Sequence, residues 1–282
     1  MLMHIHSFLK KKITRVKKEK VIIPCLEGTL LKDKVAFITG GSSGIGYAIA
    51  QCFLKNKASV ILTGRSLEKL KCAKSSLIRE CKCDEKKIDY MVLDITSVND
   101  IKKFFSSYLK KKKIDIFVNN AGVNGGDLFP YTSEDDYDRV LETNLKGMYF
   151  ISQEIAKYMV ENNIKGNILN ITSASSLRPG ISPYIISKWG ERSLTLGMAK
   201  KYLPYGIVVN GLAPGSTLTP MLNKDETDDL SLDYSPSGRY LSPEEIGNLA
   251  TILVSDMGRM IVGDTIYATG GAGLLTFDDT TY

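Results

Sequence analysis

VAFITGGSSGIG, residues 35–46, is the stretch that decides the fold. Its apolar first half, 35–40, predicts a buried strand that ends in glycines. Apolar residues continue beyond the turn at helical spacing, as Ile45, Ala48, Ile49, Cys52 and Phe53, and predict a helix. Glycines between a strand and a helix let the backbone approach a pyrophosphate, and the helix N-terminus offers free N–H groups to it. The position therefore favours a dinucleotide site over a tight turn without a ligand.

The rest of the chain repeats this alternation of strand and helix. Further strands are expected at 59–64, 89–94, 114–120, 167–172, 207–214 and 264–268, and further helices at 66–80, 98–112, 134–161, 184–202 and 243–254. Such a chain predicts an α/β fold with one doubly wound, Rossmann-like parallel sheet in a single domain, 29–282. The polar stretch 222–241 is too long for an ordinary connection and is expected to form a lid over the substrate.

Composition places the protein among cytoplasmic globular proteins. Of its 282 residues, 43% are hydrophobic, yet no run reaches the roughly 18 apolar residues of a membrane span. The five cysteines are scattered, which favours reduced thiols and predicts no metal site.

The net charge of +6 is confined to the first twenty residues, where seven basic side chains face one acidic side chain. We interpret residues 1–28 as a basic N-terminal arm. A nucleic-acid-binding enzyme would be expected to carry its excess charge on the folded body, so no nucleic acid partner is expected. The arm can be a solvated tail, a contact to an acidic protein, or a helix that touches anionic membranes weakly through residues 1–20.

The end of the second strand should select the dinucleotide. Enzymes that use NAD place an acidic residue there, which bonds the ribose 2′-hydroxyl. This chain has Gly64 and then Arg65, and no acidic residue before Glu68. A guanidinium can bind a 2′-phosphate through two parallel hydrogen bonds, so the sequence predicts NADP(H).

Tyr184 and Lys188 are four residues apart and share one face of the helix expected at 184–202. An ammonium beside a phenol favours the phenolate, which can exchange a proton with an alcohol or carbonyl oxygen. Tyr108 and Lys112 have the same spacing but precede a lysine run on an expected surface helix. We interpret that second pair as coincidental.

Several motifs occur together and in order, and in these the chain resembles the short-chain dehydrogenase/reductase family, in its single-domain branch that includes 3-oxoacyl-carrier-protein reductases and related carbonyl reductases. The resemblance spans about residues 29–273. Its cofactor-binding positions fall on Gly40, Ser42, Ser43, Gly44, Ile45, Gly46, Arg65, Asp94, Ile95, Asn120, Ala121, Gly122, Tyr184, Lys188, Pro214, Gly215, Thr217 and Thr219. Its catalytic positions fall on Asn144, Ser173, Tyr184 and Lys188.

The resemblance implies hydride transfer between NADP(H) and a carbonyl or secondary alcohol. Tyr184 would exchange the proton, Ser173 would polarise the oxygen, Lys188 would hold the ribose, and Asn144 would support a proton path. Ser173 precedes Tyr184 by 11 residues where 13 is commoner in the family, so Ser175 and Ser176 remain alternatives. The family also implies a homotetramer or a homodimer.

Two other functions stay open at this stage. A relative that binds dinucleotide as a sensor or scaffold would be expected to lack the tyrosine or the lysine, and both are present. A sugar-nucleotide-modifying relative would be expected to carry a larger region after Gly271. The substrate itself, and the direction of the reaction, are not indicated by the sequence.

Overall fold

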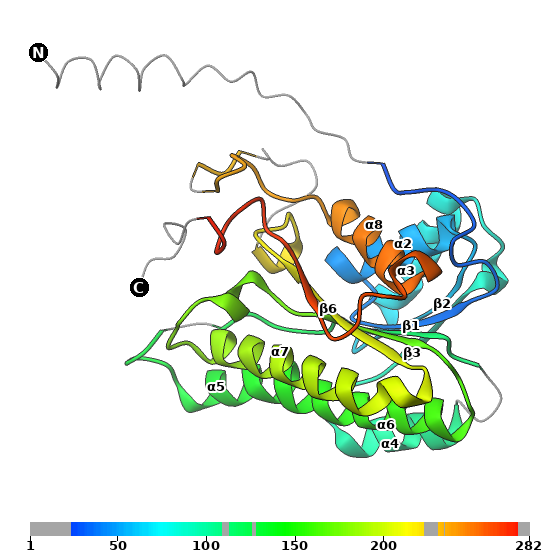
Figure 1. The fold of residues 1–282 in the computed structure, drawn as a ribbon, viewed down its shortest axis with the longest axis horizontal. Coiled ribbons are helices and arrows are strands. Elements are labelled where there is room, and N and C mark those ends of the chain that lie inside the picture. Colours follow the sequence, from blue (N-terminus) through cyan, green and yellow to red (C-terminus); the bar gives the residue numbers. More distant parts are fainter. Residues whose placement is uncertain (1–23, 109–112, 126–127, 223–230, 234, 276–282) are drawn as a thin grey trace, which may run out of the picture.

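Seven parallel strands form one twisted sheet in the computed structural model, which describes residues 24–108, 113–125, 128–222, 231–233 and 235–275 (Figure 1). Their order across the sheet is β3-β2-β1-β4-β5-β6-β7. The strands are β1 (Val35–Thr39), β2 (Ser59–Gly64), β3 (Ile88–Val92), β4 (Ile116–Asn119), β5 (Asn167–Ile171), β6 (Val208–Pro214) and β7 (Thr265–Ala268). The order reverses between β1 and β4, so the chain leaves the carboxyl ends of these two neighbouring strands toward opposite faces of the sheet. The crevice between the two connections is where ligands bind in folds of this kind. This confirms the predicted doubly wound, Rossmann-like sheet.

Helices cover both faces of the sheet. One layer holds α2 (Gly44–Lys55), α3 (Leu67–Cys81) and α8 (Pro243–Val254), and the other holds α4 (Val98–Ser107), α5 (Glu134–Leu141), α6 (Met148–Glu161) and α7 (Pro183–Tyr202) (Figure 1). Five of these helices begin after a serine whose side chain accepts a hydrogen bond from a backbone N–H of the first turn. Such N-caps fix where each helix begins.

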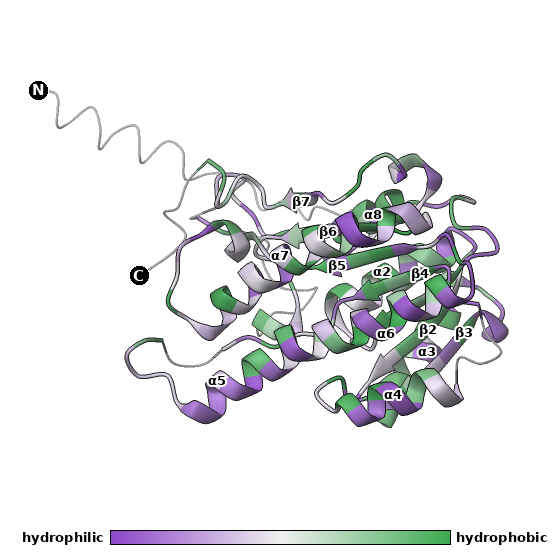
Figure 2. Cartoon of the chain, turned by 60° about the horizontal axis from the view of Figure 1, so that its bottom comes forward, coloured by the Kyte–Doolittle hydropathy of each residue, from purple (hydrophilic) through white to green (hydrophobic). Residues whose placement is uncertain are grey.

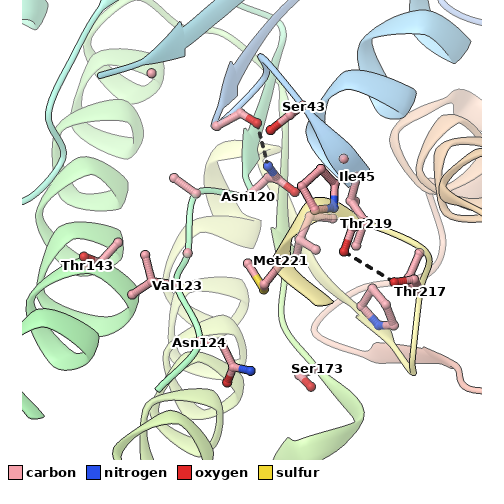
Figure 3. Close-up of a pocket in the computed structure, with 18 of the residues that line it drawn as sticks. Ser43, Ile45, Asn120, Val123, Asn124, Thr143, Ser173, Thr217, Thr219 and Met221 are labelled. Carbon is pink, nitrogen blue, oxygen red and sulfur yellow. Dashed lines mark hydrogen bonds between the residues drawn. The ribbon is translucent and has the colours of Figure 1, made fainter. Parts of the chain in front are cut away.

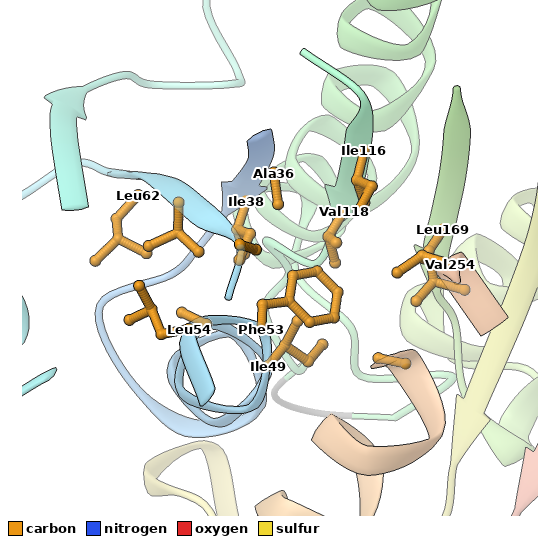
Figure 4. Packing of buried hydrophobic residues seen from close by; sticks show 14 of the residues in the cluster. Ala36, Ile38, Ile49, Phe53, Leu54, Leu62, Ile116, Val118, Leu169 and Val254 are labelled. Carbon is orange, nitrogen blue, oxygen red and sulfur yellow. The ribbon is translucent and has the colours of Figure 1, made fainter. Parts of the chain in front are cut away.

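Two apolar clusters fill the space between the layers. Figure 4 shows the first, in which Phe53 and Ile49 of α2 pack beneath Ile38 and Val118 of the sheet. The second cluster lies on the opposite face around Phe37 and Phe117 and includes side chains of α4 and α6. Because the central strands are buried on both faces, their sequences are continuous runs of apolar residues.

The helix expected at 134–161 is interrupted. A π-helical segment, η3 (Glu142–Gly147), separates α5 from α6. The helix expected at 98–112 corresponds to α4, which ends at Ser107, and residues 109–112 lie outside the described part of the chain.

Most of the expected arm and half of the expected lid also lie outside the described residues. Residues 24–28 are described and pack on the sheet's helices, because Asn248 of α8 and Asn56, which follows α2, hydrogen-bond the backbone on either side of the buried Cys25. In the lid, 223–230 and 234 are not described, while Leu232 and Leu241 are buried. Within the described residues, no helix is long and apolar enough to cross a membrane.

Candidate active site

A cavity of about 600 Å³ opens at the carboxyl ends of β1, β2, β4, β5 and β6. The glycine-rich turn after β1 lines this cavity, and so do Ser173 and Tyr184. Figure 3 shows Asn120 and Thr219 beside the turn, with Ser173 and Asn124 farther along the same hollow. All of the predicted site residues line this cavity except Gly46 and Asn144.

The glycine-rich turn is built for close approach of a ligand to the backbone. Gly40 and Gly44 adopt φ angles of 64° and 54°, a region that favours glycine. A Cβ on Gly46 would lie 2.4 Å from the carbonyl oxygen of Gly40, so Gly46 allows the helix to start directly against the strand. Gly46 therefore shapes the turn from behind, while Gly40 and Gly44 line the cavity.

The N-terminus of α2 fits the phosphates of a dinucleotide. Its N-cap residue, Ser43, makes no side-chain capping hydrogen bond, and the first turn contains no acidic residue. Both Ser42 and Ser43 line the cavity. The free N–H groups and the positive end of the helix dipole are thus directed at the space where a pyrophosphate would lie.

Two cations lie where β2 ends. Arg65 lines the cavity, as do Ser66 and Lys69 at the start of α3. The sequence analysis singled out Arg65 and missed Lys69, although the helical register that follows the N-cap Ser66 could have indicated it. Asp94 is the one acidic residue among the described residues that line the cavity. It lies after β3, where its carboxylate accepts hydrogen bonds from the backbone and hydroxyl of Thr96.

A buried threonine links β1 to the segment after β4. The Thr39 hydroxyl accepts hydrogen bonds from the backbone N–H groups of Asn120 and Ala121 at 2.9 and 3.0 Å. The Asn120 amide donates back to the carbonyl oxygens of Thr39 and Gly40. The Asn120 amide and the Thr39 hydroxyl thus tie the two strand ends together, and the sequence analysis did not identify Thr39.

Asn144 lies in the π-helical segment and is almost fully buried. Its amide donates to the carbonyl oxygen of Val123 and to the hydroxyl of Ser187, and its Oδ1 accepts from the N–H of Val123. The π turn places this side chain between the loop after β4 and α7. Asn144 thus lies behind the cavity wall, next to Lys188, because a Cβ on Gly122 would touch both side chains.

The three candidate serines differ in where they point. Ser173 and Ser175 both line the cavity, and the Ser173 hydroxyl accepts a hydrogen bond from the N–H of Ser175. Ser176 is fully buried, donates to the carbonyl oxygen of Ser173 and lies 3.3 Å from the Tyr267 hydroxyl. The geometry therefore favours Ser173 and Ser175 over Ser176 as a contact for substrate.

Tyr184 and Lys188 lie on one face of α7 and line the same cavity as Ser173. The Lys188 ammonium lies 5.4 Å from the centre of the Tyr184 ring. It is buried and forms an ion pair with Glu191, a residue that the sequence analysis did not identify. Burial lowers the pKa of Lys188, but the Glu191 carboxylate opposes this and leaves the pKa raised.

The segment after β6 closes the cavity on the side of the expected nicotinamide. Pro214, Gly215, Thr217 and Thr219 all line it, and the Thr219 hydroxyl donates to the carbonyl oxygen of Thr217 (Figure 3). A Cβ on Gly215 would lie 2.9 Å from the Cα of Thr269 in the next segment. Because Gly215 has no side chain, the turn after β6 can pack directly against the segment that follows β7.

Tyr108, the tyrosine of the second tyrosine–lysine pair, does not line the cavity. Tyr108 follows α4, and its hydroxyl hydrogen-bonds Asp89 of β3. Lys112 lies outside the described residues. No cluster of three or more metal-ligating side chains occurs in the part of the chain that the structure describes.

The fold and this cavity define a class. The chain belongs to the short-chain dehydrogenase family, whose model matches residues 34–230. It is therefore an oxidoreductase of that family that binds a nicotinamide dinucleotide, with a small-molecule carbonyl substrate.

Particular relatives resemble it over nearly their whole length. The 3-oxoacyl-[acyl-carrier-protein] reductase of Thermotoga maritima is 35% identical over 246 residues, which cover 86% of this chain and 98% of the relative. Gluconate 5-dehydrogenase of Gluconobacter oxydans is 32% identical over 243 residues, covering 84% and 93%. The crystal structure of levodione reductase matches with a TM-score of 0.80 at 27% identity, covering 87% of this chain and 100% of that one.

Two further solved structures contain cofactor. A 3-ketoacyl-(acyl-carrier-protein) reductase from Brucella melitensis was solved with NADH and matches at 28% identity with a TM-score of 0.76, over 86% of this chain and 98% of that one. Actinorhodin polyketide ketoreductase was solved with NADPH and matches at 27% identity with a TM-score of 0.77, over 86% and 97%. Relatives of this fold thus bind either dinucleotide.

Proposed function

We propose that the protein is an NADP(H)-dependent reductase or dehydrogenase that interconverts a carbonyl compound and a secondary alcohol. The observation that carries this proposal is that Tyr184, Lys188 and Ser173 share one cavity with the glycine-rich turn. A reacting oxygen between Ser173 and Tyr184 would lie at the end of the cavity opposite the phosphate-binding turn. The bound nicotinamide supplies or accepts the hydride.

In this proposal Tyr184 exchanges the proton with the substrate oxygen, and Ser173 donates a hydrogen bond to that oxygen. Lys188 holds the ribose, and its ammonium lies beside the Tyr184 ring. Asn144 keeps the loop after β4 against α7 through its bonds to Val123 and Ser187. The side chains with these roles lie on α7, on η3 and just after the end of β5.

The preference for NADP(H) rests on charge at the end of β2. Arg65 and Lys69 both line the cavity there, and none of the described lining residues at that strand end is acidic. A 2′-phosphate carries a negative charge that two cations would stabilise and a carboxylate would repel.

The proposal is tested with a panel of ketones, aldehydes, sugars, sugar acids and acyl thioesters, in which turnover is measured by the change in NADPH absorbance. The relatives named above act on chemically different compounds, so the panel must span these classes. Tyr184→Phe should lower kcat by about 10²–10⁴-fold on any substrate that the protein accepts, because only the proton donor is lost. NADPH binding, measured by fluorescence, should be largely unchanged.

Tyr108→Phe is the matched control, since it removes a hydroxyl from the second tyrosine of the same spacing, away from the cavity. It should leave kcat near the wild-type value. A Tyr184→Phe protein that keeps wild-type kcat would show that another group transfers the proton. If the unmutated protein turns over no substrate of the panel, a dinucleotide-binding sensor or scaffold would be the better description.

A further inference from the structure

The ion pair between Lys188 and Glu191 is unlike other pairs of similar spacing on the helices. Its ammonium lies 2.8 and 3.0 Å from the two carboxylate oxygens, and the side chains are 7% and 3% exposed. The pair Lys157 and Glu161 on α6, by comparison, is 3.8 Å apart and 64% and 60% exposed. Solvated pairs of that kind contribute little, whereas a buried pair in low dielectric fixes both groups.

Glu191 lies behind the cavity wall, where it contacts Lys188 and does not itself line the cavity. Lys188 lines the cavity and Glu191 does not, so the carboxylate contacts the ammonium from the side away from the ligand. The backbone of Glu191 is held in turn, because its carbonyl oxygen accepts a hydrogen bond from Thr195, which also accepts one from Asn170 of β5. The carboxylate is thus anchored on a rigid part of α7.

The elements around the pair bring no competing charge close to it. The charges that act on Lys188 are those of Glu191 and Tyr184, and the one that acts on Glu191 is Lys188. On the packed elements, Asp136 of α5 is paired with Arg139, and Glu142 of η3 with Lys146. Glu134, Asp135 and Asp138 of α5 are exposed, and Glu154, Lys157 and Glu161 of α6 are half-buried or exposed. The 3-10 helix η4 (Ala174–Leu177), β5 and β6 contain no charged residue; Arg178 follows η4, and Arg192 of α7 bonds the carbonyl oxygen of Ser176.

We propose that Glu191 is a positioning residue that keeps the Lys188 ammonium charged and fixed against the cavity wall. This inference rests on the proposed function, in which Lys188 holds the ribose and acts on Tyr184. Without the carboxylate, a buried ammonium at the end of a flexible stem would be free to change its rotamer or lose its proton.

The pKa shifts of Lys188 and Glu191 determine the direction in which the pH profile should move when Glu191 is replaced. Burial lowers the pKa of Lys188, while Glu191 and Tyr184 raise it, with a net rise above the ordinary value for lysine. Removing the Glu191 carboxylate leaves burial, the largest effect, and the smaller opposing effect of Tyr184, so the pKa of Lys188 should fall. Burial also raises the pKa of Glu191 to about 7 against the lowering effect of Lys188, so the pair is ionised from about neutral pH upward.

The test compares Glu191→Gln with the wild type across pH in two readouts, NADPH affinity by fluorescence and kcat. Glutamine keeps the shape and removes the charge. We expect the alkaline limb of both profiles to move to lower pH. Glu191→Asp, which restores a carboxylate, should move the limb back toward the wild type. Glu161→Gln, which breaks an exposed pair, is the control and should leave both profiles unchanged.

Identical pH profiles for Glu191→Gln and the wild type would overturn the inference. An equal loss at every pH would also overturn it, because it would indicate a merely structural role. Failure of the proposed function is a separate outcome, since it would show as retained turnover in Tyr184→Phe.

A measurement on the unmutated protein covers the case in which the variant does not fold. The NMR resonance of the Lys188 side chain, assigned with Lys188→Arg, should report a proton retained above the ordinary titration range of lysine. Titration within or below that range would overturn the inference without any Glu191 variant.

Discussion

The end of β2 is the position where single side chains should decide which dinucleotide is used. Arg65 is exposed at the mouth of the cavity, so it can reach a ligand without reorganising the core. A charge-assisted hydrogen bond contributes about 1.5–3 kcal/mol. Arg65→Ala should therefore lower kcat/KM for NADPH by about ten- to a hundredfold and leave kcat/KM for NADH nearly unchanged.

Arg79→Ala provides the control for general loss of positive charge, because Arg79 lies on α3, the helix that follows Arg65, and does not line the cavity. It should leave the ratio of the two cofactors unaltered. Equal use of NADPH and NADH by the unmutated protein would contradict the assignment of Arg65. Lys69→Ala should fall between the two variants, since its ammonium is a point charge and forms no bidentate contact.

Individual residues differ in how far the sequence could identify them. Tyr184 and Lys188 could be predicted because their spacing and motif order are both visible, and the structure brings them together with Ser173. Glu191 could not, because an acidic residue three positions after a lysine is a common pattern on exposed helix faces. Only the packing of α7 on the sheet shows that this carboxylate is buried.

At the scale of elements, the start of α8 depends on one carboxylate. Glu245 completes a capping box with Ser242, and both of its oxygens accept hydrogen bonds from Arg239 at 2.8 Å. The hydrogen bonds from Arg239 lower the pKa of Glu245 below its ordinary value of 4.5. A carboxyl group of this kind stabilises the fold above its unfolded pKa, and the contribution is lost as pH falls through the folded pKa.

Glu245→Gln should accordingly lower the free energy of unfolding by about 1 kcal/mol at neutral pH, since both groups are partly exposed. The difference from wild type should shrink below about pH 4.5, where the carboxylate takes up a proton. Urea unfolding at several pH values measures this. Glu244→Gln, on the same turn but outside the capping box, should cost less, and a cost for Glu245→Gln that does not change with pH would contradict the explanation.

The order of the strands and helices could be predicted, but the break between α5 and α6 could not. Glu142-Thr143-Asn144-Leu145-Lys146-Gly147 contains no proline, and its single glycine does not mark a π turn. The segment is set by tertiary contacts, since a Cβ on Gly147 would lie 2.8 Å from the carbonyl oxygen of Ile95. Periodicity therefore predicts one long helix, and the buried position of Asn144 emerges only from packing.

At the scale of the whole molecule, one side carries apolar surface that the monomer leaves uncovered. Tyr149 of α6 and Ile186, Trp189 and Leu196 of α7 are 45–51% exposed, and the two helices lie next to each other (Figure 2). Exposed large apolar side chains on adjacent helices are typical of protein–protein contacts. We expect a homotetramer, or at least a homodimer, in solution. Light scattering should give a mass well above the 31.2 kDa of one chain, and a mass equal to it would contradict the expectation.

The basic N-terminal arm, residues 1–28, is also a feature of the whole molecule. We expect it to affect where the protein is located and not the reaction that it catalyses. The cavity is built from residues between Gly40 and Leu222, and residues 24–28 are already anchored on α2 and α8. Deleting residues 1–20 removes seven basic side chains and leaves these contacts in place. We therefore expect kcat and NADPH affinity near the wild-type values.

The same deletion should abolish any binding to vesicles that contain anionic lipid. Each basic residue near such a surface contributes about 1 kcal/mol at most, so the binding of the full chain should be weak and should fall as salt is added. Sedimentation with anionic vesicles, and with zwitterionic vesicles as the control, measures it. A truncated protein that folds but has lost turnover would show instead that the arm contributes to the active site or to its assembly, and that the catalytic domain begins before residue 29.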